Sequence, residues 1–382
     1  MNFIKKNALA LLANLNYILK QQTDSILHNK KLQSLEANWQ GLAWLCQHTP
    51  SHHNLKIKLL DCAQDNYLFE CQRTTDYEHT TLFKLLFKEY DQAGAEPFSL
   101  LLCSYTFDHK QPSISQLSAL IATAQHCFCA VATSIDKTFF KIPSIEQLNK
   151  INLNYFYENE EYQDWKACRN NPDSIFVNLS LPEILMRPPY HSELARKTTD
   201  YLWGNAVFSV GLDCILKFIE SNHYENETTK ARKTKKIVTK MTMRPDTLSQ
   251  LEKLGLTIIN EDKHYQFQNK IQHFSFKNTE LNFIDILFLC RIIHHIKSQG
   301  RNLIGSKQTQ ASCQKIIHQW LQHYTVEMNP LNSDFNESYP FCFSSVNVKL
   351  LPGKWQAYLC ELSFKIRKKN NELDFINFQL TI

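Results

Sequence analysis

The chain has 382 residues, of which 43% are hydrophobic and 21% are charged. This composition is typical of a globular protein and excludes a disordered or fibrous chain. Glycine is scarce, with 8 residues, and no G-x-G-x-x-G, Walker or G-x-S-x-G motif occurs. The sequence therefore argues against the common nucleotide-binding and α/β-hydrolase classes.

The net charge of +5 is concentrated in one stretch. Residues 230–240, KARKTKKIVTK, hold six basic side chains and no acid. Aromatic side chains do not interleave the lysines, so the pattern favours a solvated loop over a nucleic-acid interface.

No apolar run is long enough to insert in a membrane. The first 22 residues predict a helix rather than a signal peptide, because asparagines interrupt the apolar run and no A-x-A site follows. We therefore expect a cytoplasmic protein. Twelve cysteines without a CxxC pair fit that compartment as buried free thiols.

The first part of the chain alternates helices and strands. Helices are expected at 2–21 and 24–47, the second capped by Asp24 or Thr23, and a strand at 54–60. A helix (80–90), a strand (98–107), a helix (113–128) and a short strand follow. This order is typical of α/β organisation.

The segment LQSLEANWQGLAWL (32–45) is unusually apolar. Leu35, Trp39, Leu42 and Cys46 recur at i, i+4, i+7 and i+11, which places them on one face of a helix. The pattern predicts that this face packs on a core.

The later chain divides into two further blocks. Residues 144–235 are rich in proline and contain a long predicted helix, 195–222. Strands are expected at 236–243 and 256–260, and helices at 245–255, 281–299 and 309–324. Three strands close the chain, the first two as a hairpin at Pro352-Gly353. The predicted domains are thus 1–143, 144–235 and 236–382, in an α/β (α+β) fold whose mixed sheet is flanked by helices.

Candidate catalytic and metal-binding residues are weak. His126 is adjacent to Cys127, and adjacent side chains diverge on a helix, so a thiol-dependent enzyme is disfavoured. The pairs His52-His53 and His294-His295 lack the i, i+4 spacing of a shared metal site. Glu89 and Glu96 are expected to be structural, as is Arg187, for which an anion site is the less favoured alternative. We predict no enzyme activity, no metal and no cofactor.

Five segments, in order, resemble the large subunit of the contractile sheath of type VI secretion systems. LEANWQGL is similar to the family's LEA-x-W-x-GL, and EYDQAGAEPFSLLLCSYTF to EYG-x-x-GGEPFG-x-LIGDYEF. NPDSIFVNLSLPEILMRPPY, YLWGNAVFSV and VNVKLLPGKWQAYLCELSF also match. The retained motif residues include Glu36, Trp39, Gly41, Glu96, Pro97, Phe98, Tyr105, Arg187, Tyr190, Trp203, Gly204, Asn205, Pro352, Gly353 and Tyr358.

The resemblance implies a structural role for these residues. Trp39 is expected to pack against the sheet of the sheath-forming domain, and Gly41 to allow close approach of helices. The resemblance further leads us to expect a shortened N-terminal linking segment before the first helix. The last strand, ELDFINFQLTI, is therefore expected to link subunits through Phe375, Phe378 and Leu380.

The resemblance also implies partners and a function. The expected partners are the small sheath subunit, further copies of the chain, the inner tube protein and the baseplate, and neither nucleic acid nor a membrane. The subunit would polymerise around the inner tube and contract to drive it outward. The alternative is a non-polymerising adaptor or cap protein that keeps the sheath fold.

Overall fold

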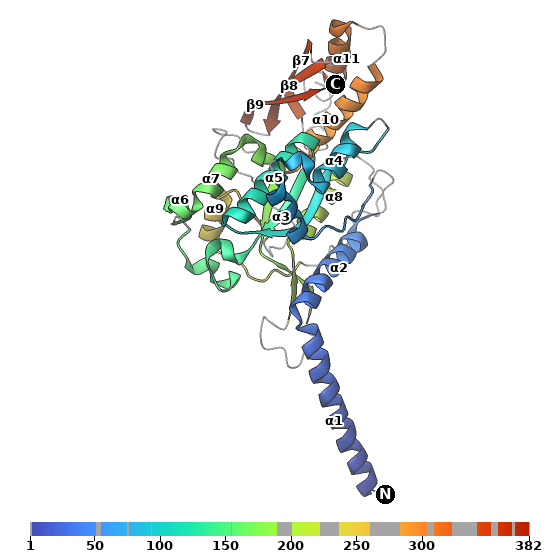
Figure 1. Ribbon diagram of the computed structural model, residues 1–382, viewed down its shortest axis with the longest axis vertical. Helices are drawn as coiled ribbons and strands as arrows, with labels where there is room; N and C mark the ends of the chain where they lie inside the picture. Colours follow the sequence, from blue (N-terminus) through green and yellow to red (C-terminus); the bar gives the residue numbers. More distant parts are fainter. Residues whose placement is uncertain are drawn as a thin grey trace.

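The computed structural model describes most of the chain, namely residues 2–50, 55–74, 76–92, 94–153, 155–188, 201–221, 237–259, 283–303, 309–322, 342–352, 358–368 and 371–381. Its body carries a helical arm at one end and a small antiparallel sheet at the other (Figure 1).

A four-stranded parallel sheet forms the centre of the body. Its strand order is β1-β2-β3-β6, with bounds Leu100–Phe107, Ala130–Ile135, Val177–Leu181 and Thr257–Ile258. Every residue of β2 and β3 is buried, as expected for central parallel strands that are covered on both faces.

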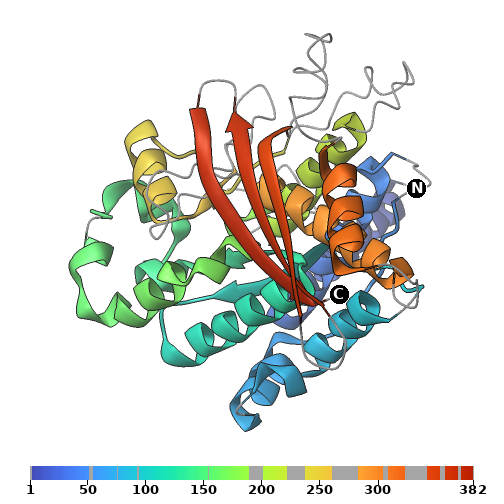
Figure 2. The same cartoon turned by 90° about the horizontal axis from the view of Figure 1, so that it is seen from above.

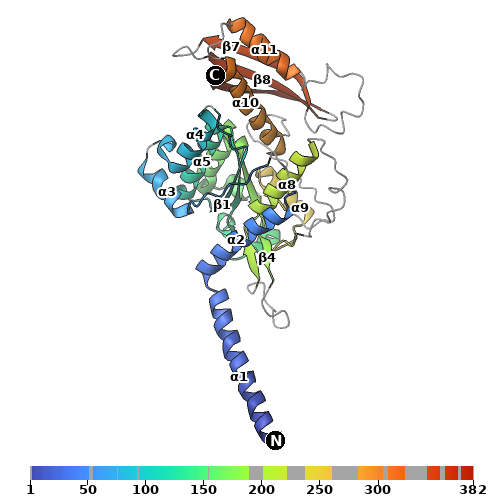
Figure 3. The same cartoon turned by 90° about the vertical axis from the view of Figure 1, so that its right-hand side faces the viewer.

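Helices lie on both sides of this sheet (Figure 3). One side holds α3 (Gln64–Arg73), α4 (Thr81–Asp91) and α5 (Gln111–Cys127), while α8 (Val207–Ser221) lies on the other. The buried Leu120 and Ile121 of α5 and Val210 of α8 supply apolar surface to the two sides. The predicted α/β fold class is therefore confirmed.

Shorter elements connect these layers. The 3-10 helices are η1 (Tyr77–His79), η2 (Lys137–Phe140), η3 (Ile145–Lys150), η4 (Glu160–Tyr162) and η5 (Pro172–Phe176). The remaining helices of the body are α6 (Tyr155–Glu158), α7 (Gln163–Asn170) and α9 (Pro245–Lys253). Strands β4 (Ile184–Arg187) and β5 (Leu202–Gly204) form a separate antiparallel pair.

The C-terminal part consists of two helices and a meander. Helices α10 (Phe283–Leu303) and α11 (Gln310–Gln322) lie beside the antiparallel strands β7 (Cys342–Pro352), β8 (Tyr358–Lys368) and β9 (Asn371–Thr381), as Figure 2 shows. Within the described residues, β9 pairs with β8 alone.

The first two helices form the arm and its base. Helix α1 (Asn2–Leu27) projects from the body, and α2 (Lys30–His48) connects it to the body (Figures 1 and 3). The predicted cap at Asp24 is wrong, because α1 continues to Leu27. The side chain of Asn29 caps α2 instead, accepting from the backbone amides of Lys31 and Leu32.

Several predicted elements differ from the structure. Residues 55–60 form no strand despite their alternation, and within 237–243 only Thr239 makes a single bridge, to Ile184. The predicted helix 195–222 starts at Val207, after β5, and its residues 195–200 lie outside the described ranges. The predicted strand 256–260 is reduced to β6. Alternation of apolar and polar residues predicts a strand, but a strand forms only where another strand pairs with it, which the local pattern does not determine.

Candidate assembly surfaces

Helix α2 packs on the body through a face that carries two small residues and a leucine. Its buried residues are Ala37, Gly41 and Leu45. A Cβ atom on Gly41 would lie 2.3 Å from ring carbons of Phe208 on α8. This glycine therefore allows the close approach of α2 and α8.

A charged contact joins α2 to β4. Arg187 Nε donates to Glu36 Oε1 at 2.5 Å, and its Nη2 donates to Glu36 Oε2 at 3.1 Å. The two side chains are 23% and 19% exposed. Two motif residues that are 151 positions apart thus form a bidentate, half-buried ion pair, and Arg187 also donates to the Pro188 carbonyl.

The prediction that Trp39 packs on the sheet is wrong. Trp39 is 55% exposed and Leu35 is 57% exposed. The side of α2 that carries Gly41 packs on α8, because a small residue lets the two helices come close. Of the predicted apolar face, Leu42 packs against the body, whereas Leu35, Trp39 and Cys46 are exposed.

The motif around Asn205 connects the end of β5 to the central sheet. Asn205 Oδ1 accepts from the Val207 amide at 2.9 Å, at the start of α8, and from the Ser134 hydroxyl. Its Nδ2 donates to the Tyr105 carbonyl at 3.4 Å. Asn205 therefore fixes the start of α8 against β1 and β2.

The other residues of this region have packing contacts. The Tyr105 ring is buried, and its hydroxyl donates to the Cys62 carbonyl at 3.0 Å. A Cβ atom on Gly204 would lie 2.5 Å from Met186, so only glycine fits there without a shift. The centroid of the Trp203 ring lies 5.9 Å from that of the Tyr201 ring, and the two rings are tilted by 32°.

The segment around Pro97 lies at the edge of the sheet, just before β1. Glu96 forms an ion pair with Lys56, and the Lys58 ammonium lies 5.0 Å from the Phe98 ring. The Lys56 hydrogen bond lowers the pKa of Glu96, although both side chains are more than 60% exposed. Through Lys56 and Lys58, these contacts join residues 55–60 to the segment that precedes β1.

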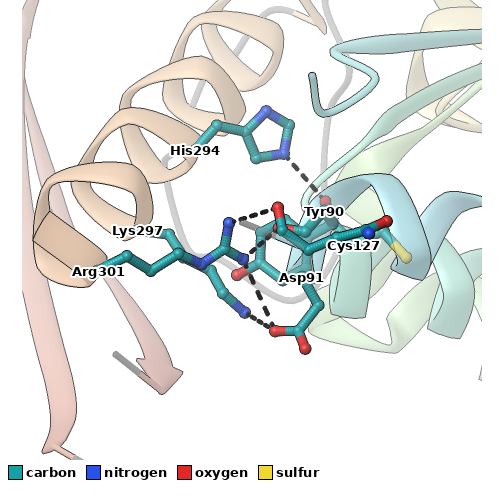
Figure 4. Close-up of polar contacts among 7 residues, drawn as sticks. Tyr90, Asp91, Cys127, His294, Lys297 and Arg301 are labelled. Atoms are coloured by element: carbon teal, nitrogen blue, oxygen red, sulfur yellow. Dashed lines mark hydrogen bonds and ion pairs between the residues drawn. The ribbon is translucent and has the colours of Figure 1, made fainter. Parts of the chain in front are cut away.

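A polar cluster that sequence reasoning missed joins α4 to α10 (Figure 4). Lys297 Nζ donates to Asp91 Oδ1 at 2.7 Å and lies 4.0 Å from the Tyr90 ring centroid. Arg301 donates to the carbonyls of Tyr90 at 2.7 Å and Gln92 at 3.0 Å, which are orphan acceptors at the end of α4.

His294 extends this cluster. Its Nε2 donates to the Cys127 carbonyl at 3.0 Å. Burial lowers the pKa of His294 to about 4, with Lys297 and Arg291 contributing in the same direction. The i, i+3, i+7 spacing of His294, Lys297 and Arg301 is the sequence signal that could have indicated a polar face.

The last strand packs inward on the chain itself. Phe378 and Leu380 are 7% and 3% exposed. The Phe378 ring lies 6.1 Å from Phe128 and 6.2 Å from Phe176, both in the body. These side chains are therefore covered within the subunit, and a role between subunits would fall to the outer backbone edge of β9.

Some predicted residues have little or no structural description. Pro352 ends β7 opposite Tyr358 of β8, which accords with an antiparallel hairpin. Tyr190 and Gly353 lie outside the described residues, as does most of the basic stretch 230–240. Phe375 lies in β9, where it is paired with Lys365.

The thiol candidate has poor geometry for catalysis. Burial raises the pKa of Cys127 to about 12 and raises that of Cys129 well above its ordinary value, so both remain protonated at neutral pH. His126 instead approaches the Tyr77 hydroxyl at 3.0 Å. In the described part of the chain, no group of three or more His, Cys, Asp or Glu side chains could hold a metal ion.

Helix α1 exposes large apolar side chains along its whole length. They include Leu9, Leu11, Leu12, Leu15, Ile18, Leu19 and Ile26, each at least 49% exposed. No helix among the described residues combines the length and apolarity needed to cross a membrane. Polar residues such as Asn14, Asn16 and Gln21 interrupt the apolar surface of α1. Exposed apolar surface on a helix is typical of a protein–protein contact.

Comparison with known proteins identifies the family. Residues 10–253 match the EvpB/VC_A0108 tail sheath N-terminal domain, and residues 275–381 match the EvpB/VC_A0108 tail sheath gpW/gp25-like domain. The chain is also 24% identical over 379 residues to the type VI secretion system sheath protein TssC1 of Pseudomonas aeruginosa. That match covers 86% of this chain and 76% of the relative. The chain belongs to the EvpB/VC_A0108 tail sheath family, the family of the large sheath subunit of type VI secretion systems.

Proposed function

We propose that this chain is a structural subunit that polymerises with the small sheath subunit around an inner tube. Contraction of the polymer drives the tube outward, and the assembly stands on a baseplate in the cytoplasm. The observation that carries the proposal is the succession of both tail sheath domains along one chain.

Two surfaces support an assembling subunit. The projecting helix α1 exposes an apolar surface that a partner could bury. Within the described residues, β9 pairs with β8 alone, so its other edge presents backbone groups that a neighbour's strand could satisfy. Heterologous contacts of this kind generate open helices when the rotation between neighbouring subunits does not close a ring.

The described contacts of the family-motif residues are structural. The motif residues Glu36, Arg187 and Asn205 join elements of the chain to one another. In our proposal their role is to keep the subunit rigid while its lattice contacts change.

Co-expression with the small sheath subunit of the same genome tests the proposal. Negative-stain microscopy is expected to show tubes, and the chain expressed alone is expected to aggregate. Discrete particles of the pair would support the adaptor or cap function. A chain that captures no small subunit would contradict the proposal altogether.

A further inference from the structure

The sheets of the described structure have four outer strands that another chain could reach. β1 and β6 are the outer strands of the central sheet, and β7 and β9 are those of the C-terminal meander. An outer strand presents unpaired N–H and C=O groups, to which a strand of another molecule can add. Because β6 has only two residues, the edges of β1, β7 and β9 are the ones that offer a long surface for pairing.

A glutamine side chain closes the outer edge of β1. Gln64 Nε2 donates to the Thr106 carbonyl at 2.8 Å, and Gln64 Oε1 accepts from the Thr106 amide at 3.1 Å. One side-chain amide therefore takes both backbone groups that a neighbouring strand would take. Unlike a strand, a side chain cannot continue the ladder to the next residue.

This glutamine is itself held in position. The Gln116 side chain on α5 is 1% exposed, and its Nε2 donates to the Gln64 carbonyl at 3.0 Å. Gln116 Oε1 accepts from Gln64 Nε2 at 3.2 Å. Two residues before Gln64, the Cys62 carbonyl accepts from the Tyr105 hydroxyl at 3.0 Å. Gln64 therefore reaches Thr106 from a position that four hydrogen bonds to α5 and β1 fix.

Glutamines of α11 close the outer edge of β7 in the same way. Gln310 Nε2 donates to the Leu350 carbonyl at 2.6 Å, and Gln314 Oε1 accepts from the Leu350 amide at 3.4 Å. A single hydrogen bond from a side chain to the backbone is common in proteins. Here glutamine amides take both backbone groups of one edge residue at two strands that belong to different sheets, which indicates a shared role.

The edge of β9 is treated differently. Its polar side chains Asn377 and Gln379 bond to Ser363 and Glu361 of the paired strand β8. Within the described residues, β9 pairs with β8 alone, and no glutamine side chain bonds to its backbone. The described contacts thus close β1 and β7 and leave the outer edge of β9 open.

We propose that Gln64 and the Gln310–Gln314 pair are edge clips, which prevent a strand of a second copy of the chain from adding to β1 or β7. In an assembly of many copies, the strands nearest to an edge are those of another copy, and a wrong pairing there would compete with the correct lattice. The clips supply specificity by removing a wrong partner rather than by strengthening a right one. The inference concerns the folded chain and does not require that the chain polymerises.

The first test removes the clip on β1. Gln64→Leu keeps the size of the side chain and removes its amide. In the chain purified with the small sheath subunit, the Thr106 amide should exchange hydrogen about two- to tenfold faster, as expected for loss of one neutral hydrogen bond. Light scattering should show self-association that grows with concentration, and the β1 peptide should regain protection as copies pair. Gln72→Leu is the matched control, because Gln72 is exposed on the same helix, and it should change neither property.

The second test removes the clip on β7 and does not depend on the first variant. Gln314→Leu leaves the Leu350 amide without its partner, so this amide should exchange faster and the β7 peptide should regain protection on self-association. A variant of one clip that fails to fold therefore leaves the other clip as the test.

Three results would overturn the proposal. Faster exchange without self-association at any concentration would show that the glutamines only stabilise their own strands. Unchanged exchange would show that the hydrogen bonds contribute nothing to closing the edges. A strand of the small subunit cross-linked to β1 in the wild-type pair would show that this edge is a docking site. A wild-type chain that binds no small subunit would instead contradict the proposed function, and the same measurements on the chain alone would then decide whether the clips exist.

Discussion

Replacing Asp91 with asparagine should loosen the contact between α4 and α10. Asp91 accepts a hydrogen bond from Lys297 at 2.7 Å, and the Lys297 side chain is 11% exposed whereas that of Asp91 is 52% exposed. A hydrogen bond to a charged group contributes about 1.5–3 kcal/mol, and the exposure of Asp91 reduces this. We expect Asp91→Asn to lower the free energy of unfolding by about 1–2 kcal/mol.

The pH dependence of this loss distinguishes electrostatics from a packing defect. Burial lowers the pKa of Lys297, and the hydrogen bond to Asp91 partly offsets that effect. Asp91→Asn should therefore lower this pKa further. Between the folded and unfolded pKa values the unfolded chain binds more protons, so stability rises with pH. The defect should be largest near neutral pH and shrink toward the ordinary lysine pKa of about 10.4.

Denaturant unfolding of the chain purified with the small subunit, at one fixed concentration, measures the effect. Glu161→Gln is the control, because the Lys141–Glu161 pair is 41% and 56% exposed. Exposed pairs contribute about 0–1 kcal/mol. Equal losses for the two variants, or a loss for Asp91→Asn that does not change with pH, would refute the reasoning.

Two further variants probe the packing of the body. Because burial depresses the pKa of His294 to about 4, stability should fall as pH drops from about 6.5 toward that value, by on the order of 1–3 kcal/mol; His294→Gln should flatten the unfolding profile. Gly41→Leu should cost about 1–3 kcal/mol in denaturant unfolding, because even a Cβ would meet Phe208 at 2.3 Å. The exposed Ala43→Leu is its control, and equal stability of the two would contradict the close approach of α2 and α8.

The fold class can be predicted from the order of apolar segments along the chain. Which face of a helix is buried, and which strands pair, cannot. The strongly apolar stretches at β1 and β2 and the periodicity of α5 and α10 lie where the sequence predicts them. The predicted strand at 54–60 does not form in its described residues 55–60. Leu55 packs against the α2–α8 cluster, and within the described part of the chain the backbone of this segment has no paired strand. A strand depends on such a neighbour, which local pattern does not contain.

The face of α2 shows the same limit for the candidate site. Trp39 and Leu35 have more apolar surface than Ala37 and Gly41, so the helical periodicity of apolar residues predicts that Trp39 and Leu35 face the core. The body instead covers Ala37, Gly41 and Leu45 and packs against Leu42 and Trp44, because the small Ala37 and Gly41 let α2 come close to α8. The Asp91–Lys297 hydrogen bond could not be predicted from the sequence either, because the two residues are 206 positions apart and local patterns do not report long-range contacts.

Removal of β9 tests whether this strand belongs to its own subunit or to a neighbour. Phe378 is 7% exposed, and its ring lies within 6.2 Å of Phe128, Phe176 and Phe364. Phe378→Ala should therefore cost about 3–5 kcal/mol, while the exposed Gln379→Ala should cost little.

Deleting residues 371–382 should accordingly expose the amides of β7 and β8 to hydrogen exchange, because β9 pairs with β8 along its length and Phe378 of β9 packs on the body. The amides of β1 to β3 should remain protected, since β9 is not a strand of their sheet. A deleted chain that keeps β7 and β8 protected and fails only to form tubes would show that β9 acts between subunits alone. In that case the inward packing of Phe378 would contribute little to folding, and the linkage of subunits would depend on the whole strand rather than on its outer edge.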